Sequence, residues 1–401
     1  MGNKITRKGE TKHHSLRVAA VGLEAELSLF VNERAEKPED IFGTPRAFIR
    51  GPLHHRRGTS FQLPTGTAVY FDTGVIELAT PPVELERGCM ARAGRMLWES
   101  IAFIRGELDA WEQRTGRVVR LAGFSTHYNV SIEAAAERPA RLNRLAKLLT
   151  YVLAPPAMLL ATNRQSNGIG VRPRGDRIEV TADFTPNPAL MVAAGSLITG
   201  IVRDITLWPS LRVAALGHRG IPRIRGFTPM PHTSRKGWLA RFDTFPANPM
   251  ANDPNAPMWH LSGRAEKKSL RSIGMEIFNH FRRPIARVAD PLSLRVIRAV
   301  LAGRELSLLD LAERPCEYHD VGRLCGWRPA HSKLAPGRSR LEQVVLHALA
   351  GDKLRIDDAY YTPIRMQGWS RIVFHRDSDK QQITFALDEL VEHLPSWRQT
   401  A

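Results

Sequence analysis

Two acidic residues stand inside an apolar segment near the start of the chain, in the run AVGLEAELSLF that begins at position 20. The flanking Leu23 and Leu27 are typical of a buried strand. Successive side chains of a strand point to opposite faces, so Glu24 and Glu26 would project together from one face. Neighbouring buried carboxylates repel each other and are costly unless a cation neutralises them. The pair therefore predicts either a magnesium site, since Mg²⁺ prefers oxygen ligands, or a strand with one solvated face.

A second acidic pair brackets a turn further along the chain. Residues 67–81 read TAVYFDTGVIELATP, and this β-rich run predicts a hairpin that turns at Asp72-Thr73-Gly74. An aspartate on such a turn can act as a general base, and Glu77 in the following strand can join a metal cluster. Aspartate also favours turns for conformational reasons, so Asp72 can equally be structural.

The strand-like segment 117–132 carries a third candidate. Strand alternation places His127 and Asn129 on one face, where they can contact a metal or a nucleotide phosphate. A histidine within a strand can equally be a hydrogen-bonded core residue. Both interpretations remain open on the sequence alone.

Three arginines form the fourth candidate. Arg172 and Arg174 precede the strand-like run RIEVTADF, and Arg177 begins it. A guanidinium group suits phosphate oxygens because it presents a rigid fork of donors. In a chain with so many arginines, any of the three can also be surface charge.

The chain is strongly basic, with a net charge of +17 and a pI near 10.4. This charge attracts polyanions, either nucleic acid, a membrane surface or an acidic protein. The basic residues are spread along the chain without a helix-turn-helix, zinc-finger or RNA-binding signature, so nucleic acid is not the expected partner. No uninterrupted apolar run of about eighteen residues and no secretory signal occur, which predicts a cytoplasmic protein that does not span a membrane. The three cysteines (Cys89, Cys316 and Cys325) form no close pair, in keeping with a reducing compartment.

The chain divides into three predicted parts. Residues 1–16 are polar and basic, which predicts a disordered tail. Residues 17–265 form the predicted catalytic domain, in which 218–262 are rich in Pro, Gly and Arg and predict a long loop. Residues 266–401 form a smaller predicted domain, helical to about 350 and then hairpin-like.

No Walker-type phosphate loop, dinucleotide-binding glycine motif or nucleophile elbow is present. The order of the remaining motifs resembles the Pup ligase and depupylase (Pup deamidase) family of the glutamate–cysteine ligase and glutamine synthetase superfamily. The resemblance covers about the first two hundred residues. It rests on five segments: GLEAE at 22–26, similar to the family's opening Gly-x-Glu-x-Glu; TGTAVYFDTGVIELATP at 65–81; STHYNVSI at 125–132; RIEVTADFTPNPALMVAAGSLITGIV at 177–202; and GRELS at 303–307.

The resemblance implies an α+β fold in which a glutamine-synthetase-like curved antiparallel sheet is flanked by helices, with ATP on its concave face. It implies ATP and Mg²⁺ as cofactors and a small acidic protein modifier or peptide as partner, which fits the basic charge. It also implies a role for each matching residue: Asp72 as the catalytic residue; Glu24, Glu26, Glu77 and His127 as metal ligands; and Arg177, Arg174, Arg172, Asn129 and Glu179 at the nucleotide.

The chain departs from the family pattern at three places. Tyr128 stands where the family has glutamate, Glu179 stands where it has histidine, and Pro186-Asn187-Pro188 replaces much of an Asp-Ala-Asn region. These departures leave the number of metal ions and the mode of substrate recognition open.

Three functions are compatible with the sequence. The first is an ATP- and magnesium-dependent enzyme that forms an amide or isopeptide bond through an acyl phosphate, or that hydrolyses one. The second is a ligase of the glutamate–cysteine ligase type, which joins a small carboxylate to an amine on the same fold. The third is a non-catalytic basic binding protein with that fold.

Overall fold

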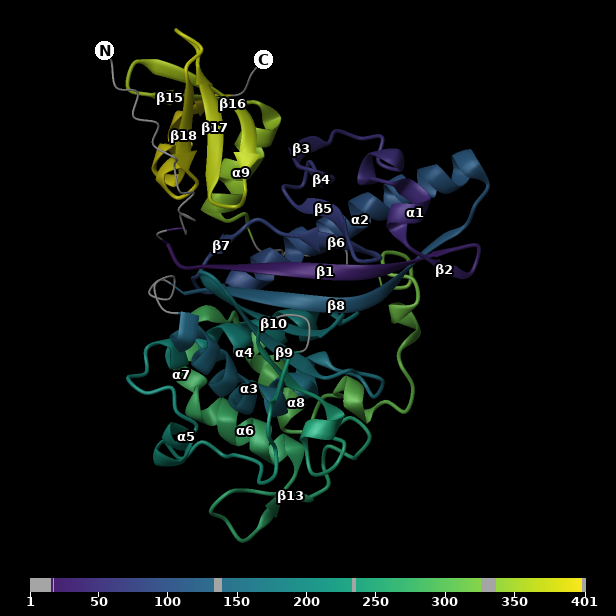
Figure 1. Cartoon of the computed structure of the whole chain (residues 1–401), viewed down its shortest axis with the longest axis vertical. Coiled ribbons are helices and arrows are strands. Elements are labelled where there is room, and N and C mark those ends of the chain that lie inside the picture. Colours follow the sequence, from purple (N-terminus) through teal and green to yellow (C-terminus); the bar gives the residue numbers. More distant parts are fainter. Residues whose placement is uncertain (1–15, 17, 133–138, 233–235, 326–336, 399–401) are drawn as a thin grey trace, which may run out of the picture.

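A twelve-stranded antiparallel sheet organises the molecule (Figure 1). The computed structural model describes residues 16, 18–132, 139–232, 236–325 and 337–398; the predicted tail at 1–16 lies outside these except for Leu16. The main strand order is β11-β12-β9-β10-β8-β1-β6-β5-β4-β3, with β2 and β7 also paired to β1. The strands are β1 (Ala20–Val31), β2 (Arg34–Glu36), β3 (His54–Arg57), β4 (Ser60–Gln62), β5 (Ala68–Asp72), β6 (Val75–Ala79), β7 (Val83–Glu84), β8 (Val119–Ser131), β9 (Ile169–Arg174), β10 (Arg177–Asp183), β11 (Met230–Pro231) and β12 (Trp238–Ala240).

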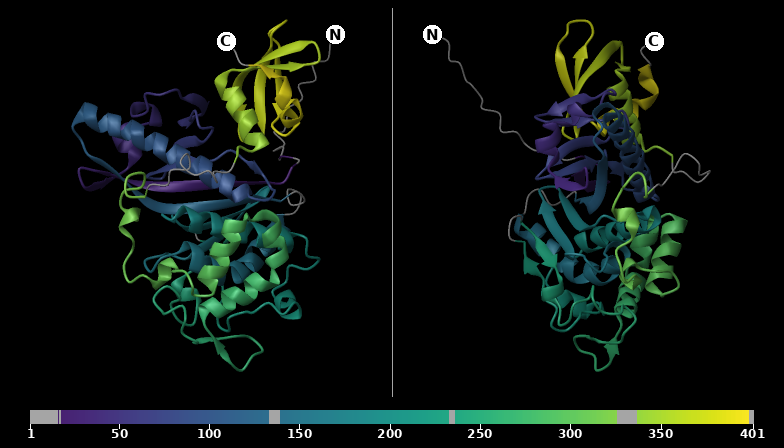
Figure 2. Two further views of the ribbon diagram at one scale, coloured as in Figure 1. Left: turned by 180° about the vertical axis from the view of Figure 1, so that it is seen from behind. Right: turned by 90° about the vertical axis from the view of Figure 1, so that its right-hand side faces the viewer.

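Three long helices cover one face of this sheet. They are α2 (Cys89–Thr115), which packs on β1, α3 (Pro139–Ala161), which packs on β9, and α4 (Pro188–Thr206), which packs on β8. Figure 2 shows the helices gathered on one side of the sheet in its right-hand view. The alternate residues Leu23, Ala25 and Leu27 of β1 are fully buried in this apolar layer. The intervening polar residues consequently point to the opposite face.

Local sequence explains where these elements begin and turn. Asn187 caps α4 as its sequence predicts, because its side-chain oxygen accepts hydrogen bonds from the backbone N–H groups of Ala189 and Leu190. The hairpin predicted over residues 67–81 is also present as β5 and β6.

Both α3 and α4 are long and apolar enough to cross a membrane by length and composition alone. Within the protein, however, 83% and 78% of their apolar windows are buried. Their apolar composition is therefore that of core helices. Hydropathy alone does not distinguish such helices from membrane-spanning ones.

A second layer of helices lies outside the first. It consists of α6 (Leu270–His280), α7 (Arg282–Val288) and α8 (Pro291–Leu301), which pack on α3 and α4. Shorter elements complete this part: α1 (Pro38–Phe42), α5 (Ala214–His218), β13 (Trp259–His260), β14 (Lys267–Lys268) and 3₁₀ turns at Pro45–Ala47, Phe242–Thr244, Leu308–Asp310 and Cys316–Tyr318. One continuous hydrophobic core runs from Val21 to Cys325. The expected boundary at 265/266 thus falls inside this core, because the apolar faces of α6–α8 are buried against α3 and α4.

The C-terminal domain is a separate small unit with its own core, between Leu341 and Trp397. It contains α9 (Arg340–Ala350), a 3₁₀ helix (Glu389–Ser396) and a five-stranded antiparallel sheet. The strands are β15 (Lys353–Ile356), β16 (Ala359–Gln367), β17 (Arg371–Arg376), β18 (Gln382–Ala386) and β19 (Trp397–Arg398). The predicted antiparallel α+β fold with a smaller C-terminal domain is confirmed.

The start of α9 attaches this domain to the main body. Arg95 of α2 donates to both carboxylate oxygens of Glu342, and both side chains are buried. In addition, the Leu341 N–H donates to Glu84 of β7 at 2.7 Å. These contacts fix α9 beside the first strands of the sheet.

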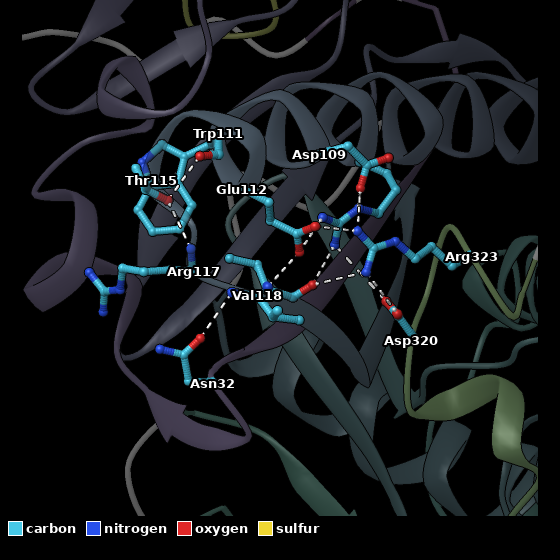
Figure 3. Close-up of polar contacts among 11 residues, drawn as sticks. Asn32, Asp109, Trp111, Glu112, Thr115, Arg117, Val118, Asp320 and Arg323 are labelled. Atoms are coloured by element: carbon cyan, nitrogen blue, oxygen red, sulfur yellow. Dashed lines mark hydrogen bonds and ion pairs between the residues drawn. The ribbon is translucent and has the colours of Figure 1, made fainter.

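An ion-pair network joins the segment around residue 320 to the C-terminal end of α2 (Figure 3). Arg323 contacts Asp109 and Glu112, and the buried Arg105 contacts the same two carboxylates. Asp320 lies 3.5 Å from the Arg323 guanidinium. Every carboxylate of this network therefore faces at least one guanidinium group.

Candidate active site on the open face of the sheet

Strand register brings four of the predicted residues together at the centre of the sheet. β1 lies between β6 and β8, and Figure 1 shows β1 and β8 running side by side. Glu24 pairs across with His127 of β8, and Glu26 pairs with Glu77 of β6. Residues at paired positions share a face, so all four side chains project from the face opposite the helices.

The turn between β5 and β6 brings Asp72 to the same place. Thr73 and Gly74 have φ values of 52° and 93°, and a two-residue hairpin loop with two positive φ angles is a tight turn that favours glycine. Asp72 is half-buried and accepts a hydrogen bond from the Thr73 hydroxyl at 2.8 Å. The turn thus uses Asp72 structurally while its carboxylate still faces the site.

Glu26, Asp72 and Glu77 form a carboxylate cluster. One oxygen from each lies within 4.8 Å of the other two. Burial, followed by the negative charge of Glu24, raises the pKa of Glu77 to about 8. The Tyr70 hydroxyl donates to Glu77 at 2.6 Å, and burial raises the pKa of Tyr70 as well. The cluster therefore holds negative charge that burial and repulsion make unfavourable.

His127 connects the two glutamates of β1. Its Nδ1 lies 3.1 Å from Glu24, and its Nε2 lies 3.1 Å from the Ser125 hydroxyl and 3.6 Å from Glu26. Burial alone would lower the pKa of His127, but the hydrogen bond with Glu24 and the charge of Glu26 outweigh it, and the net shift is upward. Glu24, His127 and Glu179 also have ligand atoms within 4.8 Å of one another.

All three predicted phosphate-binding arginines have partners within the protein, but not the same ones. Arg172 and Arg174 both form ion pairs with Glu179, with Arg174 Nε 3.0 Å from its carboxylate. Burial raises the pKa of Glu179, but His127 and these arginines outweigh it and hold the pKa below its ordinary value. Arg177 instead donates to the Asn129 side chain at 2.8 Å, and its Nη1 lies 3.8 Å from the exposed carboxylate of Asp176.

All the predicted site residues therefore lie on one face, yet they divide into two groups. Asp72, Glu24, Glu26, Glu77 and His127 gather around the carboxylate cluster, whereas Arg172, Arg174, Arg177, Asn129 and Glu179 form a mutually paired group on β8, β9 and β10. Arg172 and Arg174 already share the carboxylate of Glu179.

Two residues of the site were missed by sequence reasoning. Ser125 donates to Glu26 and contacts His127, and Tyr70 donates to Glu77. Each lies two positions before a predicted site residue on the same strand. The alternation that links Glu24 with Glu26 would have found both.

The carboxylate cluster suits a magnesium ion. Its donors are carboxylate oxygens, which Mg²⁺ prefers, and a dication would relieve the repulsion that raises the pKa of Glu77. Glu26 and Glu77 would hold the ion together with the neighbouring Glu24, and Asp72 and His127 lie beside them. Glu179, which stands where the family has histidine, is less suited to hold the ion, because Arg172 and Arg174 already form ion pairs with its carboxylate.

Comparison with solved structures identifies the architecture. A structure of the complex between the prokaryotic ubiquitin-like protein Pup and its ligase PafA matches with a TM-score of 0.53, covering 94% of this chain and 93% of that chain. The chain has the fold of a Pup ligase. Sequence identity in this match is 11%. The likeness therefore confirms the resemblance read from the motifs at the level of the fold.

The other comparisons add less. A structure of the Pup ligase PafA in complex with ADP matches with a TM-score of 0.42 and 11% identity, covering 84% of this chain and 90% of that chain. No protein-family model and no curated protein sequence match the chain.

Proposed function

We propose that the protein is an ATP- and magnesium-dependent enzyme that acts on the amide bond between a carboxylate and an amine. The observation that carries this proposal is the convergence of Glu26, Asp72 and Glu77, with a raised pKa at Glu77, on the open face of a Pup-ligase-like sheet. Burying such a cluster without a cation is unfavourable, so a functional reason for keeping it is expected.

The carboxylates would bind the metal and nucleotide. Glu24, Glu26 and Glu77 are the proposed ligands, with His127 holding Glu24 in place through its Nδ1 contact. Tyr70 and Ser125 orient Glu77 and Glu26, respectively, by hydrogen bonds. When bound, ATP would supply the phosphoryl group that activates a substrate carboxylate as an acyl phosphate, with ADP as the leaving group, and magnesium would neutralise the phosphate charge; the amine would then displace phosphate.

Asp72 is the proposed general base. In the direction of bond formation it would accept the proton of the attacking amine, and in hydrolysis it would accept a proton from water. Its position at the rim of the cluster, on a tight turn, leaves its carboxylate beside Glu26 and Glu77. Arg177 is the proposed cation for the transferred phosphoryl group, because it donates to the neutral Asn129 and its one ion pair, with Asp176, is a long contact of 3.8 Å between exposed side chains.

The proposed partner is a small acidic protein or peptide. The matched ligase structure contains the small protein Pup, and the net charge of +17 would attract an acidic chain. Screening acts over about 8 Å at physiological ionic strength, so affinity for a polyglutamate peptide should fall between low and physiological salt. Salt-independent binding would show that the net charge of the protein does not contribute to recognition of the partner.

The function is tested by titrating MgATP into the protein in a calorimeter and by trapping an acyl phosphate with hydroxylamine. Binding should require Mg²⁺ and should weaken by roughly 10–100-fold in Glu26→Gln, since losing even an outer-shell partner of a metal typically has that effect. Glu33→Gln, which changes an exposed carboxylate outside the site, is the control. Equal MgATP affinity in the wild type and Glu26→Gln would contradict the proposal.

A further inference from the structure

Arg56 occupies an irregular position in β3, at the edge of the main sheet. His55 pairs with Phe61 and Arg57 with Ser60, so Arg56 is the extra residue of a β-bulge. Bulges bend a strand and re-aim a side chain, and they are common next to active sites. The bulge lies within the basic run at 54–57, to which the proposed mechanism assigns no role.

The guanidinium group of Arg56 lies between the two domains. Its central carbon is 4.1 Å from the centroid of the Trp369 ring, in the turn between β16 and β17 of the C-terminal domain. On the main sheet, its charge acts on the Tyr70 hydroxyl, which in turn donates to Glu77. Arg56 of the main sheet thus lies between Trp369 of the C-terminal domain and Tyr70 of the candidate site.

Arg56 lacks the anionic partner that other arginines of this face possess. Within the described part of the chain no carboxylate forms an ion pair with it, and its buried Nε has no hydrogen-bond acceptor. By contrast, Arg172 and Arg174 share Glu179. Burial lowers the pKa of Arg56 to about 10, so the group still carries its charge at neutral pH.

Contact with Trp369 leaves the hydrogen-bonding capacity of the guanidinium in place. Its central carbon lies over the indole ring, which attracts the cation but offers no carboxylate or carbonyl oxygen to its N–H donors. A cation held at an aromatic ring, with a buried Nε that has no acceptor, is suited to receive a planar or tetrahedral oxyanion.

We propose that Arg56, backed by Trp369, binds an anionic group of the substrate, a phosphate or a carboxylate, at the boundary between the two domains. This inference rests on the proposed function, since it places a substrate anion beside the Tyr70–Glu77 pair. It also gives the C-terminal domain a part in the site, because that domain supplies the ring that orients the cation.

The test compares Arg56→Gln and Arg56→Lys with Arg355→Gln, an exposed arginine of the C-terminal domain that serves as the matched control. ADP and glutamate are the two probes, each titrated with and without Mg²⁺. Hydrogen bonds to charged groups typically contribute about 10–100-fold to affinity. Arg56→Gln should weaken one probe by that factor, Arg56→Lys should restore part of it, and Arg355→Gln should change neither. Weaker ADP binding identifies a phosphate as the anion, and weaker glutamate binding identifies a carboxylate.

The outcomes separate this inference from the proposed function. Failure of the wild type to bind Mg²⁺ would contradict the metal site, while the titrations without Mg²⁺ would still test Arg56. Unchanged affinity for both probes in Arg56→Gln would overturn the inference and leave Arg56 as a structural link between domains. Trp369→Leu, which keeps the charge and removes the ring, should give a smaller loss for the same probe. A lower melting temperature without any change in probe affinity would likewise overturn it.

Discussion

Two charge-rich regions of this protein treat their carboxylates in opposite ways. In the network at the far end of α2, Asp109, Glu112 and Asp320 each face Arg105 or Arg323 (Figure 3). On the open face of the sheet, Glu26 and Glu77 converge beside Asp72, and among the described residues no arginine or lysine lies at ion-pair distance from Glu26 or Glu77. In the first region arginines face every carboxylate, whereas Glu26 and Glu77 of the second region have no such partner among the described residues.

The difference is visible in proton affinity. Hydrogen bonds to Glu112 and Asp109 raise the pKa of Arg323 against the opposing effect of burial, so both charges are stabilised together. In the cluster, burial and the charge of Glu24 raise the pKa of Glu77 to about 8, so its charge is disfavoured. Paired charge thus indicates a structural role, and uncompensated buried charge indicates a site for a ligand from outside.

The largest effect is expected at Asp72. Asp72→Asn should bind MgATP with unchanged affinity and lose turnover by roughly 10²–10⁴-fold, which is the usual contribution of a general base. Asparagine retains the size and turn preference of aspartate, so the hairpin should survive. Turnover and calorimetric affinity, measured on one variant, distinguish the roles. Turnover within a few-fold of the wild type would leave Asp72 as a turn residue, and a joint loss of affinity would make it a metal ligand.

The paired network should respond through stability. Arg105 is only 3% exposed, and Arg105→Met would leave Asp109 and Glu112 with one guanidinium between them. Breaking a buried pair by removing one partner typically lowers the free energy of unfolding by about 3 kcal/mol. Urea denaturation measures this loss.

The control for that experiment is Arg92→Met on the same helix. Arg92 pairs with the exposed Glu86, and such a pair typically contributes about 0–1 kcal/mol. Equal losses in the two variants would show that the buried network is no more important than an exposed ion pair.

The cluster should respond in the opposite sense. Glu77→Gln removes one of several repelling carboxylates, so in the absence of Mg²⁺ the variant should be as stable as the wild type or more stable. Its MgATP affinity should nevertheless fall by roughly 10–100-fold. Paired denaturation and calorimetry give both quantities, and a destabilised variant with intact affinity would reverse the roles assigned to the two regions.

The cluster should also give the protein a pH dependence. The pKa of Glu77 is raised in the folded protein from 4.5 to about 8, so the metal-free fold binds more protons than the unfolded chain between these values. Its stability should therefore decline as pH rises from about 4.5 to about 8. Mg²⁺ affinity should rise over the upper part of that range, by up to about tenfold per pH unit, because binding expels the proton. Titrations at several pH values test this, and Glu77→Gln should flatten the slope.

The sequence predicts this site well wherever strand alternation applies. Alternation places Glu24 with Glu26 and His127 with Asn129, and the Asp-Thr-Gly signal fixes the hairpin that carries Asp72 and Glu77. It does not reveal which strands are neighbours, since Glu24 and His127 are 103 positions apart. The convergence of the two pairs therefore came from the family resemblance rather than from the pattern itself.

The arginines show where such reasoning ends. A guanidinium group suits a phosphate and a carboxylate equally well, so the pairing of Arg172 and Arg174 with Glu179 depends on cross-strand register. The difference between the predicted boundary at 265/266 and the observed C-terminal domain has a similar cause. Helices α6–α8 are amphipathic, and only tertiary packing decides which core they join. The bulge at Arg56 has no local signal in the run HHRR.

The position of β1 at the centre of the sheet has a consequence for folding kinetics. β1 is the first strand of the chain, yet one of its neighbours, β8, begins at residue 119, and β10 follows only after residue 176. Closing such long loops is entropically slow, and chains dominated by distant contacts fold in milliseconds to seconds rather than microseconds. During synthesis, Glu24 and Glu26 must wait for more than a hundred further residues before His127 can face them. The carboxylates of the cluster are therefore all synthesised before α2, and His127, which contacts Glu24 and Glu26, can join them only after α2 is complete.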